Sequence, residues 1–310
     1  MHWKVSAALL AVSTAVTTLA AQSVPARPRI TGVSHLAIYA KDMAATDRYF
    51  VQIVGAVKMP DPENARGVKY ALSATQYVEV LPLPAGAGIN RMDHAAYNTV
   101  SAEGLRTYLA GKGWKTPAKV NKGTDGSLWF AVHDPEGNTI EFVRPVAGAK
   151  VDAPRALGHH IIHVGYVVHD RAKEDTFYRG LLGFRPYWYG GEEHGKTEWV
   201  SQQVPDGHDW LEYMVTDGPS RPLIPADMTQ ETLGVLDHLS IGEDSVKETH
   251  KKLTAEHRLG AHHDDKPEMG LDGKWQFNMY APDGTRLELM NLHATQKPRC
   301  SPFTAADPAE

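Results

Sequence analysis

Residues 35–42 read HLAIYAKD, and a closely similar pattern returns 128 residues later as HVGYVVHD at 163–170. Both stretches open on a histidine, continue with small and apolar residues, and end on an aspartate. Such a run is typical of a buried strand, and the final aspartate suits the start of a helix. A segment that recurs at a fixed distance indicates a duplicated structural unit. The two stretches therefore predict that the chain contains one domain twice.

Two further pairs of segments extend this repeat. DHAAYN at 93–98 matches DHLSIG at 237–242, and DPEGNTIEF at 134–142 matches APDGTRLEL at 281–289. The offset between partners drifts slightly, as loop insertions would cause. The sequence therefore predicts four successive parts, namely a domain at 30–146, a linker rich in Pro, Ala and Gly at 147–157, a second domain at 158–293 and a flexible tail at 294–310.

Each domain copy is itself doubled. Four segments share the order of one strand, a helix and three more strands, so the expected fold class is α+β, built from four βαβββ modules. We expect each pair of modules to form a curved mixed sheet with two helices outside it. Side chains that can cap a helix N-terminus follow the first strand of each module, at Asp42, Ser101, Asp170 and either Asp244 or Ser245. Gly55 and Gly183 suit a left-handed helix end.

Every module also carries a histidine in its first strand and a glutamate in its last strand. The pairs are His35 with Glu79, His94 with Glu141, His163 with Glu212, and His238 with Glu288. The residue two places after each histidine shares its strand face and is small, at Ala37, Ala96, Gly165 and Ser240. Small neighbours leave space beside an imidazole, as a cavity requires. We therefore expect the histidines and glutamates to face one interior.

These residue types together are typical of a metal site. An ionised carboxylate inside a sheet is costly unless it is paired or bound to a metal. Two modules would bring together two histidines and one or two glutamates, an oxygen and nitrogen ligand set that leaves positions open for water or substrate. The single cysteine, Cys300, lies in a polar segment and adds nothing to this set. The expected cofactor is a divalent metal: Fe2+, Mn2+, Ni2+, Co2+ or Zn2+.

The motifs resemble those of the vicinal oxygen chelate superfamily, which includes glyoxalase I, extradiol ring-cleaving dioxygenases, fosfomycin-resistance enzymes and bleomycin-binding proteins. The resemblance covers about residues 30–293 and rests on GVSHLAIYAKD, HDPEGNTIEFV, HIIHVGYVVHD, LDHLSIGED and YAPDGTRLELM. It implies that paired modules form a curved, partly closed sheet around one metal. The expected architecture is therefore two glyoxalase-like domains in one chain.

The resemblance also implies which residues bind the metal, because the first-strand histidines and last-strand glutamates are the ligands in that superfamily. The expected ligands are His35, His94 and Glu141 in the first domain, and His163, His238 and Glu288 in the second. Glu79 and Glu212 match an extra glutamate of the glyoxalase I-like members, where it serves as ligand or base. These two are the expected catalytic residues.

Three functions remain open on this resemblance. A glyoxalase-like lyase or isomerase is favoured. An extradiol-type dioxygenase with non-haem Fe(II) is the first alternative, but such enzymes usually place a tyrosine four residues before the proline of the last loop, with a catalytic histidine earlier. Here Asn278 stands four residues before Pro282, and 265–277 contains no histidine. The second alternative is a small-molecule binding or resistance protein without catalysis.

Residues 1–26 have the layout of a secretory signal peptide, because Lys4 precedes an uncharged stretch and small residues follow it. We therefore expect an exported protein, periplasmic or extracellular, that is not stably inserted in a membrane after cleavage. The chain has 32 Lys+Arg against 37 Asp+Glu and no basic run, so nucleic acid is not an expected partner. The expected partner is a small-molecule substrate, and a homodimer is left open.

Some residues carry weaker hypotheses. His169 shares the strand face of His163 and could line the second cavity. Lys41 holds the matching place in the first domain, which would give the two cavities different charges. A histidine exposed at the end of the strand is the favoured alternative. Tyr187, Trp188 and Tyr189 suit either a pocket wall or the core. The cluster at 262–265 is more typical of a solvated loop than of a metal site, and the proline-rich loop at 217–232 suits a cavity mouth.

Overall fold

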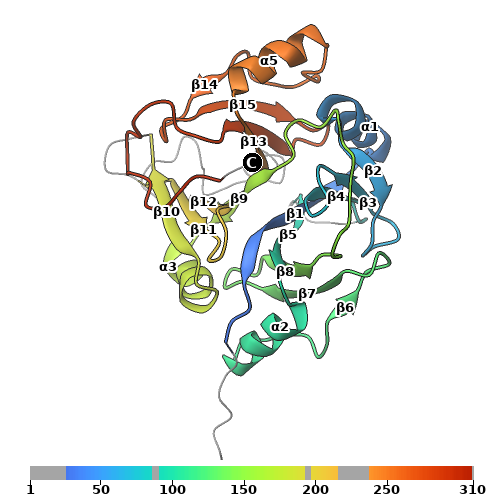
Figure 1. Ribbon diagram of the computed structural model, residues 1–310, viewed down its shortest axis with the longest axis vertical. Coiled ribbons are helices and arrows are strands. Elements are labelled where there is room, and N and C mark those ends of the chain that lie inside the picture. The colour runs from blue at the N-terminus through green and yellow to red at the C-terminus, as the bar shows by residue number, and fades with distance from the viewer. Residues whose placement is uncertain (1–25, 86–90, 193–196, 216–236, 309–310) are drawn as a thin grey trace, which may run out of the picture.

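The computed structural model describes residues 26–85, 91–192, 197–215 and 237–308. These residues form two curled eight-stranded sheets with helices at the periphery (Figure 1). The predicted signal peptide, except its last residue, and the loop at 217–232 lie outside the described residues. Within the described ranges, no helix combines the length and the apolar character needed to cross a membrane.

The first sheet is built by the N-terminal half of the chain, with strand order β2-β3-β4-β1-β5-β8-β7-β6. Its strands are β1 (Ile30–Ala40), β2 (Val57–Pro60), β3 (Val68–Ala71), β4 (Tyr77–Pro82), β5 (Met92–Thr99), β6 (Asn121–Lys122), β7 (Leu128–His133) and β8 (Thr139–Arg144). Within each module the first strand runs parallel to the last, and the two modules meet through the antiparallel pair β1 and β5.

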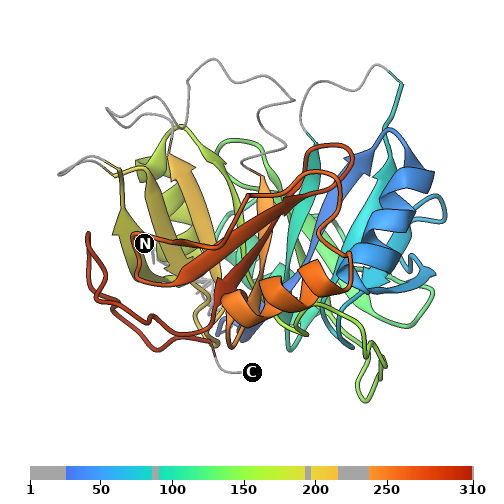
Figure 2. The same cartoon turned by 90° about the horizontal axis from the view of Figure 1, so that it is seen from above.

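The second sheet repeats this arrangement, with strand order β10-β11-β12-β9-β13-β16-β15-β14. Its strands are β9 (Ile161–Val168), β10 (Arg185–Gly190), β11 (Trp199–Gln203), β12 (Trp210–Val215), β13 (His238–Glu243), β14 (Glu268–Met269), β15 (Trp275–Tyr280) and β16 (Arg286–Asn291). Figure 2 shows the two sheets side by side from above. The predicted α+β fold of four βαβββ modules in two domains is confirmed.

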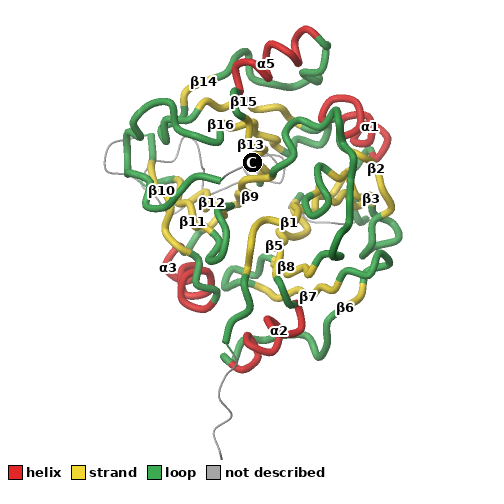
Figure 3. The backbone as a smooth tube through the Cα atoms, viewed as in Figure 1, coloured by secondary structure: helices red, strands yellow, loops and turns green. Residues whose placement is uncertain are grey.

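The helices are short and follow the first strand of each module (Figure 3). They are α1 (Met43–Arg48) continued by the π-helical η1 (Tyr49–Val54), α2 (Ala102–Gly111), α3 (Arg171–Asp175) continued by the π-helical η2 (Thr176–Leu181), and α5 (Val246–Ala255). Their N-termini are capped by the side chains of Asp42, Ser101, Asp170 and Ser245, as expected. The two π-helical continuations were not predicted.

The core lies between the helices and the outer faces of the sheets. Residues that flank the last-strand glutamates, such as Val78 and Val80, are fully buried in it. Helix residues such as Phe50, Leu105 and Leu109 belong to the same cluster. Because side chains alternate along a strand, packing these apolar residues outward turns the glutamates to the inner face. The binary pattern of the strands thus fixes the position of the carboxylates.

The register of the central strand pair places each histidine beside a small residue of the other module. His35 lies opposite Ala96 and Ala37 opposite His94, and in the second sheet His238 lies opposite Gly165. A Cβ added at Gly165 would stand 2.1 Å from Cε1 of His238. The small residues therefore make room for the imidazole of the partner module, and the space expected beside each histidine is filled by the other histidine.

Two polar side chains tie the domains together. The Gln76 amide donates to the Ile161 carbonyl and accepts from the Ile161 N–H, both at 2.9 Å. Asp209, which holds the matching place in the second domain, accepts from the Val33 N–H at 2.8 Å. Each residue directly precedes the last strand of its module and reaches the first strand of the other domain. The contact between domains therefore follows the same repeat as the domains.

A buried pair of carboxyl groups, Asp134 and Glu174, also spans the two domains. Asp134 follows β7 and accepts from the Tyr178 hydroxyl at 3.2 Å, while Glu174 of α3 accepts from the Glu136 N–H at 2.9 Å. The pKa of Glu174 is raised to about 9. Burial is the largest cause, and the negative charges of Asp134 and Glu136 add to it. Glu174 is therefore protonated at neutral pH and stabilises the pair as a hydrogen-bond donor.

Residues 294–308 differ from the expected flexible tail, because they pack on the second domain. Lys274, which is fully buried, pairs with Asp307 at 3.0 Å, and the Thr304 N–H donates to the Tyr187 carbonyl. Phe303 lies 5.0 Å from the Tyr187 ring, centroid to centroid. A buried ammonium group needs a counter-charge. Asp307 supplies it, which holds the C-terminal segment in place.

We predict that Gly165→Ala lowers the free energy of unfolding by about 1–3 kcal/mol, the usual cost of overpacking. The added methyl group would displace the buried His238 ring. Gly180→Ala is the matched control, because its Cβ would meet only Asp175 O at an ordinary 3.7 Å. Urea unfolding monitored by tryptophan fluorescence measures both. Equal stability of the two variants would contradict the register described here.

We predict that Glu174→Gln flattens the pH dependence of stability above neutral pH. The native pKa of Glu174 is raised above the unfolded value, so its contribution is complete at low pH and is lost as pH rises from about 4.5 towards 9. One such proton accounts for at most about 1.4 kcal/mol per pH unit. Glutamine keeps the donor and does not titrate. Urea unfolding curves at pH 6, 7.5 and 9 measure this for wild type and for Glu174→Gln. Equal losses of unfolding free energy with rising pH in the two proteins would contradict the prediction.

Candidate metal centres

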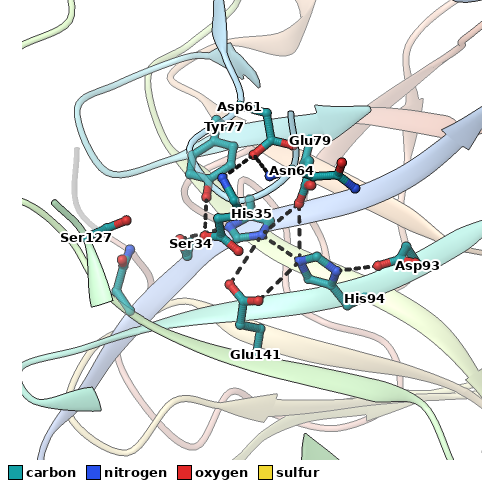
Figure 4. Close-up of polar contacts among 12 residues, drawn as sticks. Ser34, His35, Asp61, Asn64, Tyr77, Glu79, Asp93, His94, Ser127 and Glu141 are labelled. Atoms are coloured by element: carbon teal, nitrogen blue, oxygen red, sulfur yellow. Dashed lines mark hydrogen bonds and ion pairs between the residues drawn. The ribbon is translucent and has the colours of Figure 1, made fainter. Parts of the chain in front are cut away.

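In the first domain, four predicted residues meet on the inner face of the sheet (Figure 4). The Nε2 atoms of His35 and His94 are 2.8 Å apart. Oε2 of Glu79 lies 3.6 Å from His35 Nε2 and 3.4 Å from His94 Nε2, and both imidazoles lie 3.9 Å from oxygens of Glu141. All four residues are buried. The two central strands and the last strand of each module thus deliver their polar side chains to one point.

The two imidazoles are held in an orientation that suits metal binding. Burial and the neighbouring His94 lower the pKa of His35 well below its usual value, so that ring is neutral. Nδ1 of His94 donates to Oδ2 of Asp93 at 2.7 Å. A carboxylate behind a histidine fixes its tautomer and leaves the Nε2 lone pair free. That lone pair points to the shared centre.

Asp61 and Glu63 add further carboxyl groups at this centre, and the sequence analysis missed both. They follow β2, and Asp61 Oδ1 accepts from the Glu63 and Asn64 N–H groups, which folds the loop over the site. Burial and Asp61 raise the pKa of Glu79 to about 10, and burial raises that of Glu63 to about 7. Three carboxyl groups thus share a space with few positive charges.

This first centre fits a divalent cation. Oε2 of Glu79 and Oε1 of Glu141 are buried, and neither accepts a hydrogen bond within the described part of the chain. A cation between the four groups would compensate the carboxylates of Glu79 and Glu141, whose pKa values burial raises. Two imidazoles and carboxylate oxygens are ligands for Fe2+, Mn2+, Co2+, Ni2+ or Zn2+. The donor set therefore agrees with the expected cofactor.

In the second domain, His163, His238, Glu212 and Glu288 also converge. The two Nε2 atoms are 3.1 Å apart, Glu288 Oε2 lies 3.2 Å from His163 Nε2, and Glu212 Oε2 lies 3.4 Å from His238 Nε2. His163 and His238 are fully buried. The four residues match the first centre module by module.

The sequence predicts Glu288 as the metal ligand and Glu212 as the base, but in the second centre it is Glu212 that lies near both histidines. One potential ligand atom from each of His163, His238 and Glu212 lies within 4.8 Å of the others, so the geometric trio contains Glu212, the expected base. Glu288, the expected ligand, stays next to His163, whose hydrogen bond and charge lower its pKa although burial opposes this. Both glutamates are therefore placed to reach a metal between the imidazoles.

An aromatic ring supports one imidazole in each centre. Trp210 packs on His163 with 4.6 Å between ring centroids, and Tyr77 stacks on His35 at 4.2 Å. Each ring stands opposite its histidine on the parallel neighbouring strand. The repeat thus preserves the aromatic contact as well as the ligands.

A cavity of about 210 Å³ adjoins the second centre. Glu212 and Glu288 form part of its wall, together with Arg286. Arg286 was missed by the sequence analysis, although alternation along β16 places it on the Glu288 face. Tyr187 and Trp188 also line the cavity, whereas Tyr189 is 52% exposed. The aromatic run therefore contributes to both the pocket wall and the surface.

Other weak candidates lie away from the centres. His169 is exposed and pairs with Glu136 at 3.1 Å, which agrees with the favoured prediction of a strand-end surface histidine. Lys41 is exposed as well, so neither residue gives its cavity a charge. The strand ends before both positions, which turns their side chains to solvent. His262 and His263 are exposed as well, and Asp264 accepts hydrogen bonds from Asn278. That cluster behaves as a solvated loop.

A family model supports the resemblance found in the sequence. Residues 160–298 match the Glyoxalase/Bleomycin resistance protein/Dioxygenase superfamily. No curated protein matches the chain in sequence.

Solved structures share the fold over most of the chain. The 2,3-dioxygenase LapB from Pseudomonas sp. KL28 has a TM-score of 0.64 at 13% identity, over 89% of this chain and 97% of LapB. Homoprotocatechuate 2,3-dioxygenase from Brevibacterium fuscum has a TM-score of 0.61 at 16% identity, over 93% and 95%. The Mn(II)-bound glyoxalase from Novosphingobium aromaticivorans has a TM-score of 0.63 at 18% identity, over 85% and 83%.

At these identities the neighbours establish the fold and leave the reaction open. The two sheets, the four modules and the matched residues agree with one another. Residues 160–298 belong to the Glyoxalase/Bleomycin resistance protein/Dioxygenase superfamily, also called the vicinal oxygen chelate superfamily, and the chain carries that fold twice in a four-module, two-domain form.

Proposed function

We propose that the protein is an exported, metal-dependent enzyme that moves a proton on a small substrate bound through two neighbouring oxygens, in lyase or isomerase chemistry. One observation carries the proposal. In the second centre two carboxylates face the imidazole pair, Glu288 at 3.2 Å from His163 and Glu212 at 3.4 Å from His238. One carboxylate can complete a metal site while the other accepts or donates a proton.

Each residue of the second centre has its own role in this proposal. His163, His238 and Glu288 would hold the metal, which when bound supplies a Lewis acid for negative charge on a substrate oxygen. Glu212 is the more exposed of the two glutamates, with 13% of its side chain accessible against 6% for Glu288. It lines the adjoining cavity, so its carboxylate can reach a substrate carbon. We assign it as the general base.

The surroundings of the two centres support the proposal that catalysis occurs in the second domain. The cavity beside the second centre is lined by both of its glutamates. In the first domain, His35, Glu79 and Glu141 are each no more than 2% exposed. A described cavity near that domain touches Tyr77 but neither Glu79 nor Glu141. We therefore propose that the first centre binds a metal tightly and that the second centre binds the substrate.

Extradiol ring cleavage is the second candidate function. Tyr280 favours it, because these enzymes usually carry a tyrosine shortly before the proline of the last loop and Tyr280 lies two residues before Pro282. Tyr280 stands opposite Arg286 on the same strand face as Asn278. The position opposite Glu288 itself is held by Asn278, whose Nδ2 donates to Asp264 at 2.8 Å. An amide cannot transfer protons as a phenol or an imidazole does, which favours the proton-transfer proposal. A binding protein without catalysis would need neither the metal nor Glu212.

We predict that Glu212→Gln keeps the metal and loses about 100-fold or more of the catalysed deuterium exchange into hydroxyacetone, because general bases contribute on that scale. Glu288→Gln should instead weaken metal binding about 10- to 100-fold. Metal content by mass spectrometry and exchange by proton NMR separate the two effects.

Glu248→Gln, an exposed substitution on α5, is the matched control. Wild-type metal content and exchange in both site variants would contradict the assignment. Catechol-dependent oxygen uptake by the iron-loaded protein would decide for ring cleavage, and a metal-free purified protein with unchanged ligand binding would decide for the binding protein.

Export is part of the proposal and has its own test. The layout of residues 1–26 motivates it. We predict that the protein recovered from the periplasm or medium of an expressing bacterium begins within 21–27, as N-terminal sequencing would measure. A mature protein that stays in the cytoplasm with Met1 retained would contradict export and leave the metal chemistry untouched.

A further inference from the structure

The loop after β2 brings two further carboxyl groups against those of the first centre. Asp61 is 6% exposed, and its carboxyl lies within hydrogen-bonding distance of the Glu79 carboxyl (Figure 4). Glu63 makes the same kind of contact with Glu141. Two ionised carboxylates cannot bond to each other, because neither carries a donor hydrogen. Each contact therefore requires a proton or a cation between the two groups.

The loop holds Asp61 in place but leaves one of its oxygens without a donor. Oδ1 of Asp61 accepts from the Glu63 and Asn64 N–H groups at 2.8 Å and 3.1 Å. Oδ2 is buried and accepts no hydrogen bond within the described part of the chain. Gly67 makes room for it, since a Cβ there would stand 2.0 Å from that oxygen. The fold thus keeps a buried, unpartnered oxygen on a carboxyl group that meets Glu79.

Glu79 and Glu141 each face two sets of partners. Oε2 of Glu79 lies 3.4 Å from Nε2 of His94, while the same carboxyl group meets Asp61. Glu141 lies 3.9 Å from both imidazoles and meets Glu63. Carboxylates placed in this way can be shared by two cations, which lie about 3.5–4 Å apart in two-metal sites. The second position would have oxygen ligands alone, because the imidazoles meet on the other side of the two glutamates.

The first centre also carries more negative charge than one divalent cation balances. Lys69 lies over the Tyr77 ring at 4.1 Å. Burial lowers the pKa of Lys69, and the charge of Asp125 opposes this shift more than any carboxyl group of the centre does. Lys69 is therefore balanced first by Asp125, and Asp93 already accepts from His94. Four carboxyl groups remain, whose charges two divalent cations would neutralise: Asp61, Glu63, Glu79 and Glu141.

We propose that the first centre has a second cation site, formed by Asp61 and Glu63 together with the shared carboxylates of Glu79 and Glu141. A position with several carboxylates and no nitrogen ligand suits Ca2+, which takes six to eight oxygen ligands, whereas Mg2+ usually keeps most of its waters. The imidazoles keep the transition metal. The inference shares two glutamates with the metal proposed at the histidines, and it does not depend on catalysis in the second domain.

Calcium calorimetry on the zinc-loaded full chain tests this site, because zinc occupies the imidazoles first. We expect wild type to bind one calcium ion that requires Asp61 and Glu63. Asp61→Asn keeps the acceptor for the loop N–H groups and removes the charge, so it should weaken calcium binding about 10-fold or more, as other changes at metal sites do. Glu63→Gln should act in the same way and leaves the hydrogen bonds to Asp61 intact, which covers a failure of the first variant to fold.

Asp125→Asn is the matched control. Asp125 is exposed, and its replacement removes one negative charge from the neighbourhood of the same centre without touching the proposed ligands. This variant should bind calcium nearly as wild type does. Calcium affinity that falls equally in all three variants would show an effect of overall charge and overturns the proposal.

Zinc content separates failure of this inference from failure of the metal proposal. Zinc-loaded wild type that binds no calcium, or whose calcium survives both Asp61→Asn and Glu63→Gln, overturns the inference alone. Protein that binds no zinc but binds calcium through Asp61 supports the oxygen site and contradicts the metal at the histidines. A wild type that holds one zinc more than Asp61→Asn and takes up no calcium overturns the assignment to an oxygen-preferring cation.

Discussion

The cost of placing carboxylates inside a protein is the constraint on which this structure depends. Four glutamates lie on the inner faces of two curled sheets, and each is the last-strand residue between two apolar neighbours that pack outward. A buried carboxylate is tolerated when it meets a donor or a cation. The histidines of the first strands meet that need in part, because their Nε2 atoms lie within 3.9 Å of the carboxylate oxygens. The two centres differ in this respect, because burial raises the pKa of Glu79 to about 10 in the first, whereas His163 and Arg286 outweigh burial and lower the pKa of Glu288 in the second.

Pairing of the first strands makes this arrangement possible. The imidazoles of two modules approach within 2.8 Å and 3.1 Å, a distance that leaves no room for larger neighbours. Gly165 shows the limit, since even a methyl group there would overlap the His238 ring. The small residues beside the histidines are thus a packing requirement of the centre. Helix packing on the outer faces then holds the strands in register.

Repetition made most of this predictable from the sequence. The matching of His35 with His163 and of Glu141 with Glu288 identified the modules, their pairing and the four side chains at each centre. The missed features are those in which the copies differ. Asp61 lies in the loop after β2, which the repeated motifs do not include, and Arg286 stands opposite His238 where Thr139 stands opposite His94. The docking of residues 294–308 depends on the buried Lys274, which no periodic pattern marks.

Differences between the copies indicate how a duplicated site can divide its work. The first centre has additional carboxyl groups at Asp61 and Glu63 and has Asp93 behind its histidine, all of which favour a cation and oppose an anion. The second centre has Arg286 at that histidine and opens to a cavity. The guanidinium repels a cation at that histidine, whereas the carboxylate of Asp93 attracts one. Two copies of one site that carry opposite charges behind the same histidine are therefore suited to different ligands, and the proposed division between a metal-binding first centre and a substrate-binding second centre rests on this difference.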